Sequence, residues 1–455
     1  MAAVKALYGM DADEKMVQLQ KTRSEFEGNL TLVVFPFVKT ARKAPAVVAQ
    51  EIGEYLVTES GVVSSYNVVN GFLNLCIADA AWTQLLSDIE GDEHYGEKTA
   101  GEDSPLVMIE YSSPNTNKPL HLGHLRNDAL GESVSRILDF QGAEVFKVNI
   151  INNRGVHICK SMLAYQKFHQ EKGDTPESLG VKSDRFVGDC YVEFNNYAKE
   201  NPNAEQDAQN MLVEWEKGNP EIRKLWQQMN EWAVSGVQKT YDRTGVSFDK
   251  LYYESETYLK GKDEILKGLE KGIFFKADDG SVRIDVTDVV GKNKDGENQE
   301  KVLLRKDGTS VYITQDIGTA ISRHDDWAFN QMVYVVASEQ IYHFKVLFHI
   351  LKKLGFDWTD KLYHLSYGLV NLPSGRMKSR EGTVVDADDL IAAMYNTAKE
   401  TSLELGKINN LSEEEQDALF KMISLGALKY FILKVDPRKT MLFDPKESID
   451  FNGNT

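Results

Sequence analysis

The stretch from Leu106 to Gly142, LVMIEYSSPNTNKPLHLGHLRNDALGESVSRILDFQG, constrains the fold of this chain more than any other. It opens with a short apolar run of the kind that forms a buried parallel strand. A segment rich in Ser, Asn and Pro comes next, and these residues favour turns. From His124 onward apolar residues recur at helical spacing, and Gly142 suits the end of a helix. The stretch therefore predicts a strand, a loop and a helix in that order.

Two histidines, His121 and His124, flank Gly123 where the loop enters the helix. Free backbone N–H groups and the helix dipole make such a junction a binding site for anions. A glycine lets a ligand approach the backbone, and imidazole N–H groups can donate to phosphate oxygens as charge builds up on them. The pair could also be surface histidines or half of a metal site. Polar residues crowd the same strand end and favour the phosphate interpretation: Ser112, Ser113, Asn115 and Lys118.

Composition limits the classes of protein to consider. The 455-residue chain is long enough for two or three domains, and no apolar run approaches the ~20 residues of a membrane span. Its N-terminus lacks the apolar core of a secretory signal. The three cysteines, Cys76, Cys159 and Cys190, have no C-x-x-C spacing, which predicts reduced core thiols and no metal site. The net charge of −17 argues against nucleic-acid binding unless the basic side chains cluster in space.

Residues 1 to about 100 predict a small α+β unit of their own. The segment from Leu30 to Val38 is strand-like. Asn70-Gly71 divides Tyr66 to Ile77 into the two strands of a predicted hairpin. The polar, glycine-rich segment from Gly91 to Ser104 indicates a linker to a second, larger unit.

A doubly wound sheet is predicted beyond the first stretch. Glu144 to Ile151 forms a second buried strand, so that strand, helix and strand make a right-handed crossover unit. Asn152-Asn-Arg-Gly155 lies at the carboxyl end of that strand, where such sheets bind ligands. Residues 156 to about 245 predict long helices whose tryptophans pack in a core or stack on RNA bases. Met332 to Ala337 predicts another buried strand.

Three further signals lie toward the C-terminus. Val282 to Val286 and Lys301 to Thr314 are predicted as paired strands, with a tight turn at Asp307-Gly308. Gly368 to Val385 is a Gly-, Ser- and Pro-containing segment with a basic run, which indicates a flexible cationic loop. Ser412 and Glu415 form a capping box before an amphipathic helix that runs to about Leu433.

Glu110-Tyr-Ser-Ser-Pro-Asn115, followed by Lys118-Pro-Leu-His-Leu-Gly-His124, resembles the first motif of class I aminoacyl-tRNA synthetases, in the form found in arginyl-tRNA synthetases. The cationic loop resembles the second motif. The resemblance covers nearly the whole chain and implies an α/β fold. It implies a doubly wound parallel-sheet (Rossmann-like) catalytic domain over 105–435, with a helical insertion at about 156–245 and a small α+β N-terminal domain over 1–100.

The resemblance also implies a reaction, the activation of arginine with ATP and Mg²⁺ to arginyl-adenylate and its transfer to tRNA(Arg). The implied catalytic residues are His121, His124, Lys118, Lys378 and Arg380. The implied ATP site comprises Pro119, His121, Leu122, Gly123, His124, Arg376, Met377 and Ser379. Glu381 stands near the place of a second basic residue in the cationic loop, so we expect Lys118 to supply that charge from the first motif.

Selection of arginine requires recognition of a planar, permanently charged guanidinium, which carboxylates grip through two parallel bonds. The resemblance implies Asp316 and Glu254 as these acids, with Tyr312 closing the pocket. Polar groups are expected at the amino and carboxylate ends of the substrate. The full implied arginine site is Glu110, Ser113, Asn115, Glu254, Tyr312, Asp316 and Gln340.

Contacts to tRNA are implied for the N-terminal domain, with Lys39, Arg42 and Lys43 as the candidate phosphate contacts, although a solvated basic turn explains them as well. Residues 436–455 resemble the start of the connection to an anticodon-binding domain, which we expect this chain to lack. We therefore expect weakened tRNA binding, and tRNA to be needed for activation. We also expect a cytoplasmic monomer with no membrane partner.

Two alternatives remain open on the sequence alone. A small-substrate adenylyltransferase shares the H-x-G-H loop, but such chains are usually shorter and lack modules that face tRNA. A non-catalytic RNA-binding or scaffold relative is the second alternative, and the intact His121, His124 and Asp316 argue against it.

Overall fold

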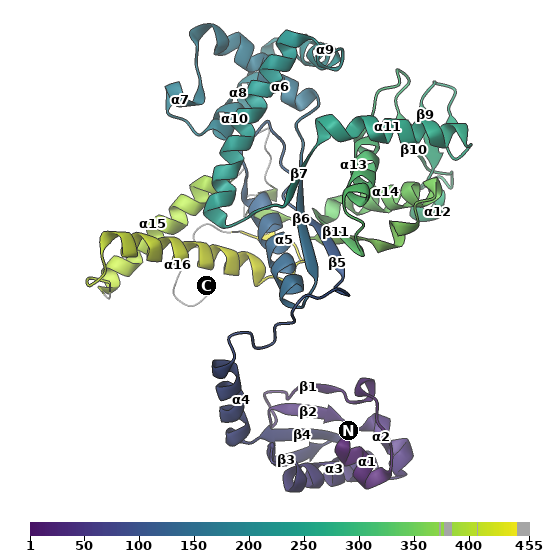
Figure 1. Ribbon diagram of the computed structural model, residues 1–455, viewed down its shortest axis with the longest axis vertical. Coiled ribbons are helices and arrows are strands. Elements are labelled where there is room, and N and C mark those ends of the chain that lie inside the picture. Colours follow the sequence, from purple (N-terminus) through teal and green to yellow (C-terminus); the bar gives the residue numbers. More distant parts are fainter. Residues whose placement is uncertain (373–374, 377–384, 407, 444–455) are drawn as a thin grey trace. The chain divides into compact units, whose positions relative to one another are not determined.

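The computed structural model describes residues 1–372, 375–376, 385–406 and 408–443 (Figure 1). The chain divides into two compact units, Met1–Glu97 and Lys98–Thr455. Within the described ranges, no helix has both the length and the apolar character needed to cross a bilayer.

The N-terminal unit is an antiparallel sheet with the strand order β1-β2-β4-β3 and accompanying helices. Its elements are α1 (Ala2–Tyr8), β1 (Leu19–Lys21), β2 (Leu30–Val33), α2 (Phe35–Ala41), α3 (Pro45–Glu59), β3 (Val63–Val69), β4 (Phe72–Ile77) and α4 (Asp79–Gly91). The predicted hairpin is confirmed, because Asn70 (φ 49°) and Gly71 (φ 80°) adopt the left-handed conformation that a two-residue type I′ turn requires. The strand predicted to reach Val38 ends earlier, since Pro36 lies in the first turn of α2, where its missing N–H costs nothing.

The second unit is built on a five-stranded parallel sheet with the order β12-β11-β5-β6-β7, so the predicted doubly wound α/β fold is confirmed. The strands are β5 (Leu106–Glu110), β6 (Glu144–Ile151), β7 (Lys250–Tyr253), β11 (Gln331–Ala337) and β12 (Leu362–Tyr367). The chain adds β6 and β7 on one side of β5 and later β11 and β12 on the other. The strand order therefore reverses between β5 and β11, and ligands bind at such a switch point beyond the carboxyl ends of the strands.

Both faces of this sheet are covered, and alternation along β5 divides the core in two. Met108 faces a core shared with α11 (Glu254–Glu270), α13 (Tyr312–Asp326) and α14 (Ile341–Leu354). Val107 and Ile109 face a second core shared with α5 (Leu122–Phe140), α15 (Ala387–Leu405) and α16 (Glu413–Leu433). Since successive strand residues point to opposite faces, an apolar run such as LVMI suits a strand that is buried on both sides.

Helices fill the segment between β6 and β7, as predicted. They are α6 (Val156–Phe168), α7 (Pro176–Leu179), α8 (Ser183–Glu200), α9 (Ala204–Glu216) and α10 (Pro220–Thr244), and Figure 1 shows them gathered beyond one end of the sheet. They have a hydrophobic core of their own. Trp215 is 1% exposed, and Trp226 and Trp232 pack against or near that core, so these rings are core residues.

The predicted strand at Val282–Val286 and the first part of the one at Lys301–Thr314 are confirmed as a pair, whereas the end of the second segment is wrong. β10 (Glu300–Leu304) pairs with β9 (Val282–Asp285), and β9 pairs with β8 (Phe275–Lys276); α12 (Thr287–Val290) comes after β9. The turn at Asp307-Gly308 forms, but α13 begins at Tyr312. The hydroxyl of Thr314 accepts the N–H of Val311 at 3.1 Å, and this cap favours a helix over a strand.

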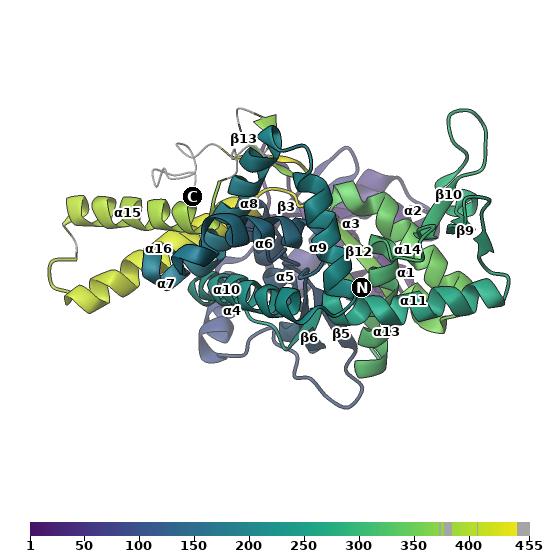
Figure 2. The same cartoon turned by 90° about the horizontal axis from the view of Figure 1, so that it is seen from above.

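The capping box predicted at Ser412 and Glu415 is confirmed, with the Glu415 N–H donating to the Ser412 hydroxyl at 3.3 Å. Helix α16 then runs to Leu433 beside α15, and Figure 2 shows the two as a long pair. The short strands β13 (Val370–Leu372), β14 (Gly375–Arg376) and β15 (Met441–Leu442) form a small sheet after β12.

Candidate active site

The loop after β5 holds Ser112 (φ 72°) and Ser113 (φ 50°) in a left-handed conformation that residues other than glycine rarely adopt. Side chains from three other elements fix it. The Ser112 N–H donates to Asn127 of α5 at 2.5 Å, and the Ser113 N–H donates to Asn149 of β6 at 3.0 Å. The hydroxyls of Ser112 and Tyr241 of α10 lie 2.6 Å apart. Strain that the surroundings enforce in this way clusters at ligand sites.

His121 and His124 cap helix α5 with their own rings. Nδ1 of His121 accepts the N–H of Gly123 at 3.0 Å, and Nδ1 of His124 accepts the N–H of His121 at 3.1 Å. The two ring centroids lie 4.0 Å apart. Because each Nδ1 acts as an acceptor, each neutral ring carries its proton on Nε2. The backbone thus sets the tautomer, and each ring keeps one N–H donor for a ligand.

The surroundings keep both rings uncharged. Burial lowers the pKa of His121 to about 3, and the nearby Lys118 ammonium adds to the shift. Burial also lowers the pKa of His124 well below its usual range, with His121 and Lys118 as further causes. A bound anion would act in the opposite direction, because negative charge favours protonation of an imidazole.

A cleft of about 400 Å³ opens beside these rings, at the switch point between β5 and β11. This volume is within the range of small-molecule sites. The cleft brings together five residues expected from the sequence to bind ATP or arginine, namely Ser113, His121, Gly123, His124 and Gln340. Its lining comprises Ser112, Ser113, His121, Gly123, His124, Asn127, Val336, Ala337, Glu339, Gln340, Tyr367, Leu369, Val370 and Asn371.

A second cavity of about 210 Å³ borders His121. Lys118 and Pro119 line it, and burial lowers the pKa of the Lys118 ammonium. Helix α8 forms the opposite wall and packs closely, because a Cβ at Gly188 would lie 2.7 Å from Cδ of Pro119. Leu122 is fully buried in the core below and lines neither cavity.

The acidic residues expected to select arginine lie near the starts of two neighbouring helices. Glu254, the first residue of α11, is 3% exposed and accepts the N–H of Arg154 at 3.4 Å. Burial raises the pKa of Glu254 to about 7; Arg154 opposes this shift and Asp316 adds to it. Tyr312, the first residue of α13, is 71% exposed, and Asp316 comes one turn later.

Two glycines let α11 and α13 approach closely enough to bring these acids together. A Cβ at Gly261 would lie 1.7 Å from the carbonyl oxygen of Thr314, and one at Gly318 would lie 2.1 Å from that of Thr257. No side chain fits at either position without a shift of backbone. The helix crossing therefore fixes the distance between the two acidic helix starts.

His343 is a member of this group that the sequence analysis missed. Its Nε2 lies 2.5 Å from a carboxylate oxygen of Asp316. It stands in the first turn of α14, directly after Gln340, which lines the cleft. The residue thus connects the acids to the cleft wall. The sequence could have indicated His343, because it stands three residues after Gln340, on the same side of a helix.

Glu110 is turned inward. One carboxylate oxygen accepts the Ser113 hydroxyl at 3.0 Å, and the other pairs with Arg323 of α13, which is 1% exposed. Both oxygens are engaged inside the protein, which differs from the direct arginine contact expected from the sequence. Arg323 was not anticipated, since nothing in its local sequence distinguishes it from a surface arginine.

Asn115 and Arg154 have structural contacts. Asn115 is exposed and its backbone bridges that of Asn152 at the end of β6. Arg154 pairs with Glu216 of α9 and lies over the Tyr258 ring at 4.3 Å. Arg154 therefore ties the loop after β6 to the helical segment.

The remaining predicted residues belong to two other regions. Met377, Lys378, Ser379 and Arg380 lie outside the described residues, and for Arg376 only the backbone pairing with Asn371 is described. In the N-terminal unit Lys39, Arg42 and Lys43 are all exposed, and Lys43 forms an ion pair with Glu51 at 2.5 Å.

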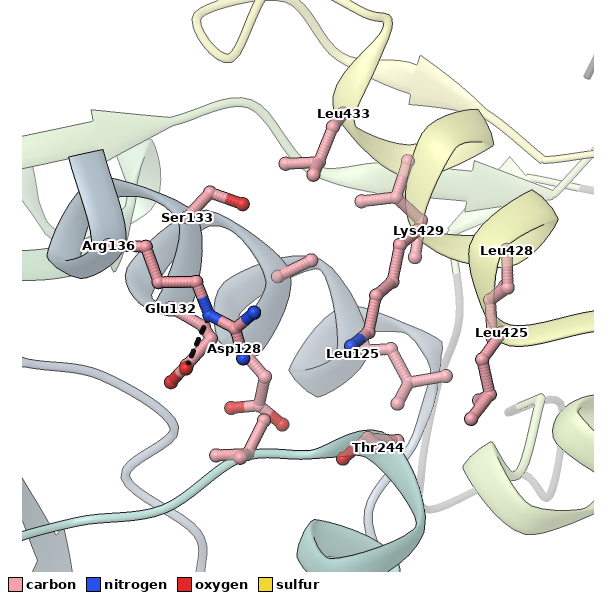
Figure 3. Close-up of a pocket in the computed structure, with 13 residues that line it drawn as sticks. Leu125, Asp128, Glu132, Ser133, Arg136, Thr244, Leu425, Leu428, Lys429 and Leu433 are labelled. Carbon is pink, nitrogen blue, oxygen red and sulfur yellow. Dashed lines mark hydrogen bonds and ion pairs between the residues drawn. The ribbon is translucent and has the colours of Figure 1, made fainter. Parts of the chain in front are cut away.

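A separate cavity of about 100 Å³ lies between α5 and α16 (Figure 3). Asp128 of α5 borders it, is 2% exposed, and has its pKa raised to about 7 by burial. Figure 3 shows the Lys429 side chain of α16 reaching toward the same space. Arg136 pairs with Glu132 at 2.9 Å, along the dashed line in Figure 3. Most of the polar side chains that line the cavity come from α5, and α16 adds Lys429 among leucine and isoleucine side chains. Its lining comprises Leu125, Asp128, Ala129, Glu132, Ser133, Arg136, Thr244, Val246, Leu425, Leu428, Lys429, Ile432 and Leu433.

Two family profiles match the chain. The profile described as tRNA synthetases class I (R), catalytic domain, matches residues 85–444, and the profile described as arginyl tRNA synthetase N terminal domain matches residues 1–77. A protein of Bacteroides thetaiotaomicron named arginine--tRNA ligase is 57% identical, and the match covers 99% of this chain and 77% of that protein. The protein of the same name from Treponema denticola is 56% identical, with 94% and 72% covered.

Solved structures agree in fold. The arginyl-tRNA synthetase of Thermus thermophilus superposes with a TM-score of 0.70 at 21% identity, and the match covers 100% of this chain and 78% of that one. The arginyl-tRNA synthetase of Plasmodium falciparum gives a TM-score of 0.69 at 17% identity, with 100% and 76% covered.

Proposed function

This chain belongs to the arginyl-tRNA synthetase family, and from that premise we propose that it activates arginine with ATP to arginyl-adenylate and transfers the arginyl group to tRNA(Arg). The observation that carries the proposal is the switch-point cleft, in which two neutral imidazoles with fixed tautomers stand at a helix N-terminus. The profile match over the N-terminal unit argues against a small-substrate adenylyltransferase.

In the first step a carboxylate oxygen of arginine forms a bond to the α-phosphorus of ATP. The bond from that phosphorus to the bridging oxygen breaks, and pyrophosphate leaves with the electron pair. Such chemistry depends on positioning and on stabilising charge, so it needs no nucleophilic side chain. We assign charge stabilisation to the Nε2–H groups of His121 and His124, the N-terminus of α5 and the Lys118 ammonium. Pro119, Leu122 and Gly123 shape the path of the backbone there.

The basic residues of the cationic loop complete the proposed ATP site. We assign Arg376, Lys378 and Arg380 to contact with the departing pyrophosphate, and Met377 and Ser379 to the nucleotide. Among the described residues of the cleft lining, Glu339 is the one carboxylate. Mg²⁺ would thus be held chiefly by the triphosphate, which suits an ion that keeps several of its waters.

The acidic helix starts provide the proposed arginine selectivity. Asp316 and Glu254 pair with the guanidinium, Tyr312 covers it, and Ser113, Asn115 and Gln340 hold the amino and carboxylate ends. A neutral analogue would leave two carboxylates without their partner, and the loss of a hydrogen-bonded charge is costly enough to make editing unnecessary. Glu110 would act on this site through Ser113.

The N-terminal unit is the proposed tRNA-contacting domain. Its candidates Lys39, Arg42 and Lys43 are all exposed, and Lys43 must leave Glu51 to reach a phosphate. Residues 105–435 form the proposed catalytic domain, with 156–245 as its insertion. We place the enzyme in the cytoplasm as a monomer, where the unpaired Cys76, Cys159 and Cys190 stay reduced. A link from 436–455 to an anticodon-binding domain stays a prediction.

A charging assay tests this proposal. We expect the protein to attach arginine to tRNA(Arg) in the presence of ATP and Mg²⁺, and to leave lysine and citrulline unattached. Lysine is charged but lacks the planar guanidinium, so it tests recognition of that geometry. Citrulline is planar but neutral, so it tests recognition of the positive charge. Charging of tRNA(Arg) with either analogue at the rate seen with arginine would refute the assignment of the acidic pair.

A further inference from the structure

A histidine, a cysteine and a glutamate meet in the helical segment, away from the cleft. His169, at the C-terminal end of α6, has Nε2 2.8 Å from a carboxylate oxygen of Glu193. The thiol of Cys190 faces the same point, and one ligand atom from each of these three residues lies within 4.8 Å of the others. It is the one such cluster that the described part of the chain contains. The reaction proposed above uses none of its members.

The spacing along α8 explains how this group assembles. Cys190 and Glu193 are three residues apart, so their side chains point to the same side of the helix. Helix α6 packs against α8 and delivers the ring of His169 opposite them. On its other side the ring is fixed, because Nδ1 lies 2.9 Å from a carboxylate oxygen of Asp174.

We propose that Nε2 of His169, Sγ of Cys190 and the Glu193 carboxylate bind one zinc ion, with Asp174 orienting the imidazole. Zn²⁺ accepts nitrogen, thiolate and carboxylate ligands together. A carboxylate on the far nitrogen of a metal-bound histidine is the arrangement that fixes its tautomer and ring direction. The contact between Nε2 of His169 and Glu193 would open to admit the ion between them.

A cluster of a histidine with two carboxylates is also satisfied without a metal. Cys190 is 0% exposed and packs in the core of the helical segment, and it takes no part in the ion pairs between His169 and its carboxylates. What the metal adds is a thiolate ligand from this third side chain, whose sulfur lies within 4.8 Å of the His169 and Glu193 ligand atoms. Binding displaces the proton of the thiol and the one between His169 and Glu193. Access is open, because the Glu193 side chain is 40% exposed.

Three protein ligands leave a fourth position for water, so we expect weaker binding than at a closed structural site with four protein ligands. The ion would join the end of α6 to α8. Helix α8 also forms the wall of the cavity beside Lys118, through Arg185, Gly188 and Tyr191. Zinc would thus stiffen the wall against which the first-motif loop packs.

Cobalt substitution tests the site directly. The purified full chain is stripped of metal, titrated with Co²⁺ in excess Mg²⁺, and read for the near-ultraviolet charge-transfer band of a cobalt–thiolate bond. We expect one equivalent to produce the band, zinc to abolish it competitively, and the melting temperature to rise with zinc. Cys190→Ser should remove the band, and Glu193→Gln should weaken binding at least tenfold.

Matched variants keep the result unambiguous. Cys159→Ser alters another buried cysteine, and Cys76→Ser alters the more exposed one, so both should keep the band. Glu193→Gln changes a partly exposed side chain and tests the site even if Cys190→Ser fails to fold. A wild-type protein without the band, or a band that persists in Cys190→Ser or at full affinity in Glu193→Gln, would overturn the proposal.

Discussion

The backbone N–H of His121 donates to Nδ1 of His124 across 3.1 Å, so the second histidine of the pair caps the helix that the first one opens. Nδ1 of His121 in turn accepts the backbone N–H of Gly123 at 3.0 Å. Each ring therefore has two tasks, which fall on its two nitrogens. Nδ1 stabilises the N-terminus of α5, and Nε2–H remains for the substrate.

This division predicts that a substitution of His121 can remove the donor for the substrate and still keep the helix cap. In His121→Asn the amide oxygen can replace Nδ1 as the cap, but no donor takes the place of Nε2–H. We expect a melting temperature close to that of the wild type, and a fall in charging kcat of roughly 100- to 1,000-fold, as for the loss of one transition-state donor. His121→Ala should lose the same activity and about 1 kcal/mol of stability as well. Equal stabilities for the two variants would contradict the capping role.

Arginine binding should depend on pH through Glu254. Burial raises the pKa of this carboxyl to about 7, so it is protonated below pH 7 and charged above it. The guanidinium prefers the charged form and does not titrate in this range. We expect the arginine Kd to fall roughly tenfold from pH 6 to pH 8 by linkage to one proton. Calorimetry in several buffers should show proton release at pH 6, and Glu254→Gln should bind weakly with a flat profile.

The crossing of α11 and α13 should tolerate no side chain at Gly261. Its Cβ would lie 1.7 Å from the Thr314 carbonyl, so Gly261→Ala must push the two acidic helix starts apart. We expect a loss of about 1–3 kcal/mol in the free energy of unfolding and a raised KM for arginine. Gly426→Ala in α16 is the matched control, because its Cβ meets nothing within 4 Å. That control should gain up to ~1 kcal/mol from helix propensity and keep KM unchanged.

The Asp128 carboxyl beside the Figure 3 cavity should make stability depend on pH. Its folded-state pKa is raised to about 7, above the unfolded value, so the native state binds the proton more tightly. Stability contributed by that proton is present at low pH and is lost as pH rises through 7. Asp128→Asn removes the cost of the buried charge. We expect it to stabilise the protein at pH 8, and by on the order of 2 kcal/mol more than at pH 5, in chemical denaturation. A gain that is equal at both pH values would contradict this account.

The parallel sheet and the position of the cleft were predictable from the sequence, because they depend on local signals. The local sequence consists of an apolar run buried on both faces, a polar loop and a capped helix. This order places His121 and His124 at the end of a strand, whatever the fold of the rest of the chain. The hairpin at Asn70-Gly71 and the cap at Ser412 are local in the same sense. The segment after Asp307 failed as a strand because VYIT suits both structures and Thr314 supplies the cap that decides between them.

The inner supports of the site could not be predicted, since they join residues far apart in the chain. Arg323 of α13 pairs with Glu110 of β5, and His343 reaches Asp316 from a neighbouring helix. The need for a glycine at position 261 likewise comes from a partner helix, α13, whose backbone leaves no room for a side chain there. For each of these residues the local sequence shows only an ordinary helical position.

The most direct test of the account is the exchange of labelled pyrophosphate into ATP, measured with arginine, with citrulline and with neither, each in the presence and absence of tRNA(Arg). The account predicts exchange that requires arginine, increases with tRNA and stays at background with citrulline. Exchange that proceeds without arginine, or equally with citrulline, would contradict it.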